Sequence, residues 1–248
     1  MPDFLLVRLE GPMQAWGDVA FDPRRPTRDF PSRSALAGLL ANALGWEHRD
    51  GARTTALQDA LRYAVREDVP PRRLRDYQTA DLERIGSQGW TRWGIEKRGG
   101  SASDGTQIQE KFYLADGSFL VALAVDDSAP TTLDDLAGAL RRPARPLFLG
   151  RKGCPPARPL LDDVYEDGEL RREARVTAET AYGALERWRL TEHPRVQTTC
   201  RCWYAPGDGP GAQPAATSEV WDRRDFATQR FTGSRRVVQG TVTPREAA

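Results

Sequence analysis

Apolar and polar positions alternate along the chain in blocks that predict strands and helices in near-regular succession. Residues 3–9 form an apolar run that ends before a Gly-Pro pair, which is typical of a buried strand. Apolar positions at helical spacing follow Ser32, and Gly45 is the expected end of that helix. Thr132 is expected to cap another helix, which Pro143 ends. Further patterns predict a short helix over 55–61, strands over 63–67, 119–125 and 147–149, and an extended segment over 72–79.

Strand, helix, strand, strand, helix, strand is the element order of a ferredoxin-like (RRM-like) α+β fold. This order spans about residues 3–150, within a first region that we place at residues 1–155. A polar, glycine-rich stretch over residues 81–110 precedes the third strand, and such an insertion is either a flexible loop or a projecting hairpin. Residues 156–248 show strand-like pieces and few helical signals, so we expect a smaller β-rich region there.

Composition narrows the classes of protein further. The chain carries 36 basic and 35 acidic residues among 248, and only three of the basic residues are lysines. Arginine suits bidentate phosphate contacts and stacking on bases, although a GC-rich genome produces the same excess. Because the net charge is only +1, any nucleic-acid surface has to be a local stripe. No apolar run approaches the ~18 residues of a membrane span and no secretory signal is visible, so we expect a cytoplasmic protein without a membrane partner.

Histidine and cysteine are too scarce for the commonest catalytic and metal sites. The two histidines, His48 and His193, stand in a polar turn and before a proline. The three cysteines include no CxxC pair, which makes a structural zinc site a poor interpretation. We therefore expect no metal, no cofactor and no catalytic residue.

Two basic clusters are candidates for phosphate binding. Residues 10–31 are predicted to be a long loop before a helix N-terminus, an end that itself favours anions, and the arginines around it are Arg24, Arg25, Arg28 and Arg33. The second cluster, Gly150-Arg151-Lys152-Gly153, follows the expected strand 147–149. Its glycines would let backbone N–H groups approach a phosphate. A merely solvated turn is the other interpretation of this segment, and both stay open.

Several longer strings carry a family resemblance. They are VRLEGPMQAWG (7–17), RPTRDFPSRSALAGLLANALG (25–45), LRDYQT (74–79), KFYLADGSFLVAL (111–123) and LFLGRKGCPPARPLL (147–161). In this order they resemble the CasD family, the type I-E CRISPR Cascade subunits that hold the 5′ handle of CRISPR RNA. The blocks cover residues 4–161, and a weaker match, WDRRDFATQRF, lies at 221–231.

The resemblance implies a fold and a binding role. The fold would be the ferredoxin-like palm of the RAMP superfamily, with a β-hairpin thumb at residues 79–113 and a β-rich C-terminal region. The partners would be the RNA handle, the CasC backbone subunits and the large CasA subunit, with target DNA bound indirectly. Matching positions, together with the arginine-rich loop, give the candidate RNA-binding residues Gln14, Trp16, Arg24, Arg25, Arg28, Ser32, Arg33, Ser34, Lys111, Gly150, Arg151 and Lys152.

Cleavage of RNA is the alternative function. A related branch of the superfamily, in type I-C systems, cuts precursor RNA without metal by a Tyr, Lys and His cluster. Here Phe112 stands beside Lys111 and no histidine is near in sequence, so the resemblance implies binding without cleavage. The alternatives are a metal-independent endoribonuclease of CRISPR repeat RNA, which would need His48 or His193 brought in by folding, and a protein scaffold without RNA contact.

Overall fold

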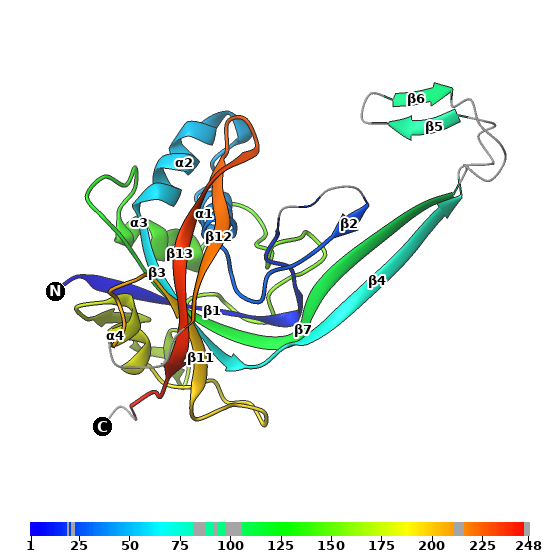
Figure 1. The fold of residues 1–248 in the computed structure, drawn as a ribbon. Helices are drawn as coiled ribbons and strands as arrows, with labels where there is room; N and C mark the ends of the chain where they lie inside the picture. The colour runs from blue at the N-terminus through cyan, green and yellow to red at the C-terminus, as the bar shows by residue number, and fades with distance from the viewer. Residues whose placement is uncertain are drawn as a thin grey trace.

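A nine-stranded, largely antiparallel sheet forms the centre of the computed structural model (Figure 1). The structure describes residues 1–18, 20, 23–81, 88–91, 94–97, 106–210 and 216–245. Along the main path of the sheet the strands follow the order β10 (Arg175–Thr177), β1 (Asp3–Gln14), β7 (Thr106–Val125), β3 (Leu61–Val69), β11 (Cys200–Tyr204), β13 (Arg230–Val242) and β12 (Ala216–Asp225). Two more strands, β2 (Arg24–Arg25) and β4 (Arg72–Asp81), pair with β7.

The helices that follow Ser32 and Thr132 begin where local signals predict them. The helix predicted over 55–61 covers residues 51–60 instead, and the helix over 181–186 was not predicted. The helices are α1 (Arg33–Ala43), α2 (Gly51–Ala60), which a 3-10 turn (His48–Asp50) precedes, α3 (Leu133–Arg141) and α4 (Ala181–Glu186). Ser32 caps α1 and Thr132 caps α3 by accepting backbone N–H bonds, as predicted. Gly45 follows α1 with φ +76°, a conformation that favours glycine. No helix of the described residues is long and apolar enough to cross a membrane.

Both faces of the central strands are covered. Figure 1 shows α1, α2 and α3 on one side of the sheet and α4 on the other. Residues 119–124 of β7 are accordingly all buried. A strand buried on both faces has no need of polar positions, which explains why this segment is a continuous apolar run. The buried side chains of the whole sheet and its helices form one hydrophobic core cluster, which includes residues of β11, β12 and β13.

Two sequence predictions near β1 were wrong. Residues 10–14 continue β1 instead of opening a long loop. Residues 147–149 are not a strand, and the bond from Ala15 N to Leu149 O joins them to the residue that follows β1. Residues 149–162 instead lie along the edge of β1 with separate backbone hydrogen bonds, and β10 continues along the same edge as a paired strand. Prolines at 155, 156 and 159 lack the N–H groups that a continuous ladder needs.

The predicted insertion has a long two-stranded ribbon as its base. Strands β4 and β7 pair without a break from Arg72–Ala115 to Asp81–Thr106, and Figure 1 shows this ribbon extending away from the rest of the sheet. A small hairpin of β5 (Gln88–Thr91) and β6 (Gly94–Lys97) belongs to the same insertion. Residues 82–87, 92–93 and 98–105 of the predicted thumb lie outside the described residues. A second small hairpin joins β8 (Val164–Glu166) and β9 (Glu169–Arg172).

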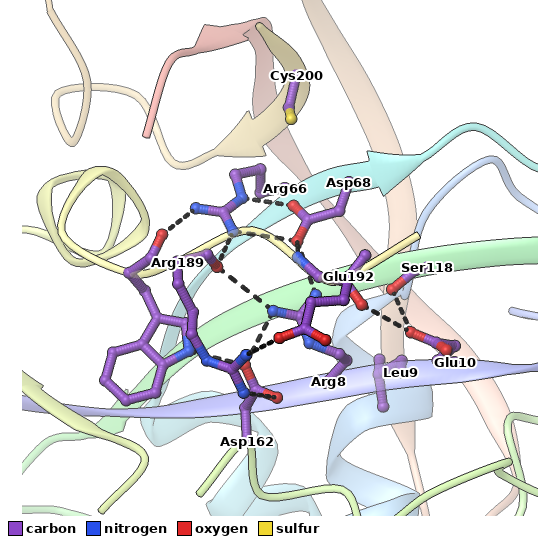
Figure 2. A network of polar contacts seen from close by, with 12 residues as sticks. Arg8, Leu9, Glu10, Arg66, Asp68, Ser118, Asp162, Arg189, Glu192 and Cys200 are labelled. Atoms are coloured by element: carbon purple, nitrogen blue, oxygen red, sulfur yellow. Dashed lines mark hydrogen bonds and ion pairs between the residues drawn. The ribbon is translucent and has the colours of Figure 1, made fainter. Parts of the chain in front are cut away.

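A buried charge network ties the C-terminal part of the chain to β1 and β3 (Figure 2). Asp68 accepts hydrogen bonds from Arg8 Nη1 at 2.7 Å and from Arg66 Nε at 2.5 Å. Arg8 also donates to Asp162, and Asp162 accepts a second hydrogen bond from the indole N–H of Trp188 at 2.8 Å. The Arg66 guanidinium donates further to the carbonyl of residue 185, in the last turn of α4, and to those of residues 188 and 189 just after it.

This network explains why Arg8 and Arg66 stand inside segments predicted to be buried strands. Arg8, Arg66, Asp68 and Asp162 all have no exposed surface, so each charge requires a buried partner. Because the two arginines reach across to the segment after α4, they fix that segment against the sheet. The division of the chain at residue 155 stays a prediction, although β10, β11, β12 and β13 all belong to the same sheet as the strands before it.

Candidate functional site

A cleft of about 440 Å³ collects most of the candidate residues. Its lining comes from the segment after β1, the first turns of α1, the turn after residue 148, and the far end of the β12–β13 hairpin. Seven of the twelve predicted residues line it: Trp16, Arg28, Ser32, Ser34, Gly150, Arg151 and Lys152. Because these positions lie far apart in sequence, their convergence is a property of the fold rather than of any local motif.

The turn at residues 150–153 requires glycine at its first position. Gly150 has φ +94°, and a Cβ there would lie 1.7 Å from the carbonyl oxygen of Ala15. Ala15 N in turn donates to Leu149 O at 2.9 Å. The glycine therefore lets the turn contact the segment after β1 directly. Gly153 has ordinary φ and open space around its Cβ position.

Arg151 is held by backbone carbonyls. Its Nη1 donates to Phe112 O at 3.0 Å, and its Nη2 donates to Arg25 O at 2.9 Å and to Pro26 O at 3.3 Å. The guanidinium also lies over the Tyr113 ring at 4.7 Å. This geometry fastens β2 and the loop after it to the root of the β4–β7 ribbon. Neighbouring Lys152 is exposed.

The start of α1 is built into the wall of the cleft. Ser32 Oγ accepts from Ala35 N at 3.3 Å and donates to Trp16 O at 3.1 Å. Arg28 pairs with Asp18 at 2.7 Å and donates to Trp221 O at 2.9 Å. Both candidates therefore also hold the wall together, and Ser34, in the first turn of α1, lines the cleft as well.

Three candidates, Gln14, Trp16 and Arg33, form hydrogen bonds with other parts of the protein. Gln14 is fully buried and donates to the carbonyls of Leu9 and Gly117 at 3.1 and 2.8 Å. Trp16 is 1% exposed, and its backbone N donates to Thr27 Oγ1 at 2.9 Å. Arg33 donates to Leu61 O at 2.8 Å, and burial, together with the charge of Arg235, lowers its pKa.

The remaining candidates lie along the ribbon rather than in the cleft. Strand β2 pairs with β7 so that Arg25 stands opposite Lys111, and Arg24 lies over the Phe112 ring at 5.1 Å. Lys111 Nζ donates to Gln78 Oε1 at 2.9 Å. Further out, Tyr77 is about half exposed and Arg75 lies over its ring at 5.5 Å. The ribbon root is thus a basic and aromatic surface beside the cleft.

The far wall of the cleft was missed by sequence reasoning. Arg224, Phe226 and Phe231, from the far end of the β12–β13 hairpin, complete the lining together with Phe148 and Asp222. A signal was present, because these three residues lie in WDRRDFATQRF, the string of weaker resemblance at 221–231. Nothing local showed that this string would fold back to meet residues 15–16 and 150–152.

Comparison with known proteins agrees with the resemblance of the sequence strings. A family model described as CRISPR-associated protein (Cas_Cas5) matches residues 4–238. This chain belongs to the CRISPR-associated Cas5 family. A relative named CRISPR system Cascade subunit CasD, from Escherichia coli (strain K12), is 38% identical over 169 residues, which cover 65% of this chain and 70% of the relative.

Solved structures match this Cas5 chain over nearly its whole length. A chain from a CRISPR RNA-guided surveillance complex superposes with a TM-score of 0.66 at 25% identity, covering 97% of this chain and 91% of its own. A second structure, described as a crystal structure of Cas protein, gives a TM-score of 0.62 at 26% identity and full coverage of both chains. The mixed α/β architecture is thus shared with Cas proteins.

The two histidines of this Cas5 chain lie in separate hollows. His48 lines a hollow of about 240 Å³ that adjoins the cleft and shares Phe226 with it. His193 lines another, of about 220 Å³, beside Glu10 and Ser118. Lys111 lines neither.

Two buried cysteines and the groups that line the cleft complete the candidate chemistry of this Cas5 chain. Burial raises the pKa of both Cys200 and Cys202 to about 12, which keeps these thiols protonated and poorly nucleophilic at neutral pH. Within the described parts of the chain, no three His, Cys, Asp or Glu side chains are grouped to hold a metal ion. What the cleft can offer is cationic groups, backbone turns and aromatic rings, which are the means by which proteins hold a single-stranded nucleic acid.

Proposed function

We propose that this chain is an RNA-binding subunit of a type I-E CRISPR Cascade complex, where it holds the 5′ handle of CRISPR RNA. The observation that carries the proposal is the cleft, where the Gly150 turn, the start of α1 and basic side chains converge. The 38% identity to a Cascade subunit CasD supports the assignment to this kind of complex.

We propose that the β4–β7 ribbon contacts both the RNA handle and a neighbouring protein subunit, as the resemblance implies for the thumb. Strands β4 and β7 carry the exposed Tyr77 and Ile108 beside arginine and lysine side chains. Such a surface suits both RNA and a neighbouring protein, so it would pack on the CasC backbone subunits and cap that backbone for assembly. CasA would be a second protein partner, and target DNA would be recognised through the assembled complex.

The four strands β10, β1, β7 and β3 support the finer description of the fold as a ferredoxin-like palm. They neighbour one another in that order and all pair antiparallel. With α1 and α3 they follow the order strand, helix, strand, strand, helix, strand, and β10 supplies the last strand in place of residues 147–149.

We further propose that the chain binds RNA without cleaving it. Cleavage by the RNA 2′-hydroxyl needs a base and an acid near neutrality, and each contributes ~10² to 10⁴ in rate. The residue beside Lys111 is Phe112, and the two histidines line hollows apart from Lys111. These facts favour binding over the alternative of a metal-independent endoribonuclease.

The test combines binding and product analysis. The purified chain is incubated with labelled repeat RNA with and without EDTA, at several salt concentrations. We expect a shifted complex and no product, and Lys152→Gln should lower the slope of log affinity against log salt by about 0.7. Arg171→Gln removes the same charge from an exposed residue on β9 that pairs with Glu166 and Glu169, and it should leave the slope unchanged.

Three results would contradict the proposal. Specific product would make the chain a nuclease, above all if His48→Ala or His193→Ala abolished it. The absence of any RNA complex would favour the scaffold interpretation. An unchanged slope in Lys152→Gln would remove the turn at 150–153 from the RNA site. In each case the same RNA and the same salt series decide the outcome.

A further inference from the structure

The far end of the β12–β13 hairpin is anchored to α2 by several contacts. Gln58 donates to Arg224 O and accepts from Arg224 N, both at 3.0 Å. Thr55 Oγ1 accepts from Phe226 N at 3.1 Å. A Cβ at Gly51 would lie 2.7 Å from the backbone of Ala227, so α2 and the hairpin meet closely. The wall of the cleft that this hairpin provides is therefore rigid before any ligand binds.

Arg224 differs from the other arginines of the cleft in its partners. Its guanidinium lies over the rings of Phe226 and Phe231, at 5.7 and 5.9 Å, and its Nη2 donates to the neutral Gln229 Oε1 at 2.5 Å. Its Nε is buried without a hydrogen-bond partner. In the described part of the chain no carboxylate forms an ion pair with it.

Two neighbouring arginines, by contrast, already have carboxylate partners. Arg28 pairs with Asp18, and Arg223, the residue before Arg224, makes a two-bond contact to Asp59 on α2. Asp222, the acidic residue of the cleft lining, forms an ion pair with Arg235. An anion that enters the cleft therefore meets an arginine without a counterion and a carboxylate whose charge is already balanced.

Arg224 is half-buried, and partial burial of a cation without a counterion costs free energy and lowers its pKa. An anion bound there would offset that cost, because charge-assisted bonds to a guanidinium strengthen in a partly dry site. The two phenyl rings fix the direction of the guanidinium, which lowers the entropy that binding loses. The site thus has the charge and the fixed guanidinium of an anion site.

We propose that Arg224 binds a phosphate of the RNA backbone, which makes the C-terminal hairpin the second wall of the RNA site. The first wall is the turn at residues 150–153, which lines the same cleft. This inference rests on the proposed RNA-binding function. It gives the C-terminal third of the chain a direct part in holding RNA, with Phe226 and Phe231 as positioning residues.

The test compares Arg224→Gln, Arg224→Lys and the matched control Arg223→Gln, which removes the same charge one residue away. RNA affinity is measured across a salt series. Arg224→Gln should lose affinity about tenfold and reduce the salt slope by about 0.7. Arg224→Lys should keep the slope, because the charge remains, and Arg223→Gln should match the wild type. Thermal unfolding of each variant shows whether the fold is retained.

A second measurement separates failure of this inference from failure of the proposed function. Millimolar inorganic phosphate should raise the unfolding temperature of the wild type and of Arg223→Gln, but not that of Arg224→Gln. If the wild type binds RNA and Arg224→Gln keeps both affinity and slope, the inference is overturned while the proposed function stands. A loss of affinity with an unchanged slope overturns it too. If the wild type fails to bind RNA, the proposed function fails, and the phosphate series still decides whether Arg224 is an anion site.

Discussion

Replacing Asp68 by asparagine removes the negative charge between two buried arginines. Asp68 accepts from Arg8 at 2.7 Å and from Arg66 at 2.5 and 3.1 Å, and it also accepts from Thr191 N at 3.2 Å (Figure 2). An asparagine keeps one oxygen and turns its NH₂ group toward a guanidinium, where two donors face each other. Arg66 would retain its carbonyl partners but lose its carboxylate.

The expected loss of stability in Asp68→Asn follows from the burial of all three side chains. Asp68 and both arginines have no exposed surface, so water cannot replace the lost partner. Removing one member of a buried ion pair costs about 3–5 kcal/mol, out of a total stability of about 5–15 kcal/mol for a typical protein. At about 2–4 °C per kcal/mol for a chain of this size, the unfolding temperature should fall by about 6–20 °C.

The assay is thermal unfolding of the full chain, followed by circular dichroism at neutral pH. Arg171→Gln is the control, because Arg171 is half exposed and pairs with exposed Glu166 and Glu169. Such surface pairs contribute about 0–1 kcal/mol, so this variant should stay close to the wild type. An unfolding temperature of Asp68→Asn equal to that of Arg171→Gln would refute the reasoning that the network holds the segment after α4.

Three further predictions concern the turn at 150–153 and acid stability. Gly150→Ala should lower stability by about 1–3 kcal/mol in denaturant unfolding and weaken RNA binding, because of the φ of +94° and the contact with Ala15. Arg151→Gln should weaken RNA binding with an unchanged salt slope and speed tryptic cleavage after Arg24, because its donors hold backbone carbonyls. Burial raises the pKa of Asp162, but the hydrogen bond and charge of Arg8 outweigh burial and hold that pKa below its ordinary value. The stability that this depressed pKa contributes is present above about pH 3.9 and is lost as pH falls through the folded-state pKa.

Each of these has a matched control. Gly153→Ala has open space and should be tolerated, so equal loss in both glycine variants would contradict the steric argument. Lys152→Gln should change the salt slope without altering tryptic cleavage, the reverse of Arg151→Gln. Asp162→Asn should be less stable than the wild type at pH 7, and urea unfolding should show the gap narrowing below about pH 4. A gap that is constant with pH would contradict the assignment of Asp162.

The strands, helices and their ends were largely predictable because their signals are local. Ser32 and Thr132 accept N–H bonds from residues three positions later, and Gly45 needs a positive φ of its own. The family resemblance was also readable from short strings, and the family match over residues 4–238 confirms it. The failure at residues 147–149 came from a partner, because apolar content predicts a strand but not what pairs with it.

The sequence by itself determined which segments are strands, helices and basic turns, and to which family they belong. The tertiary structure decided what the charged side chains do. Arg151 has the positive charge that a phosphate-binding residue needs. Its N–H donors are nevertheless occupied by three backbone carbonyls from distant segments. Residues 221–231 contain three arginines, and folding leaves Arg224 half-buried, with an unpaired Nε and without a carboxylate. The physical reason is the separation along the sequence of the groups that interact. A cap or a turn depends on residues within about four positions. The free energy of a charge depends on groups that folding brings from far along the chain.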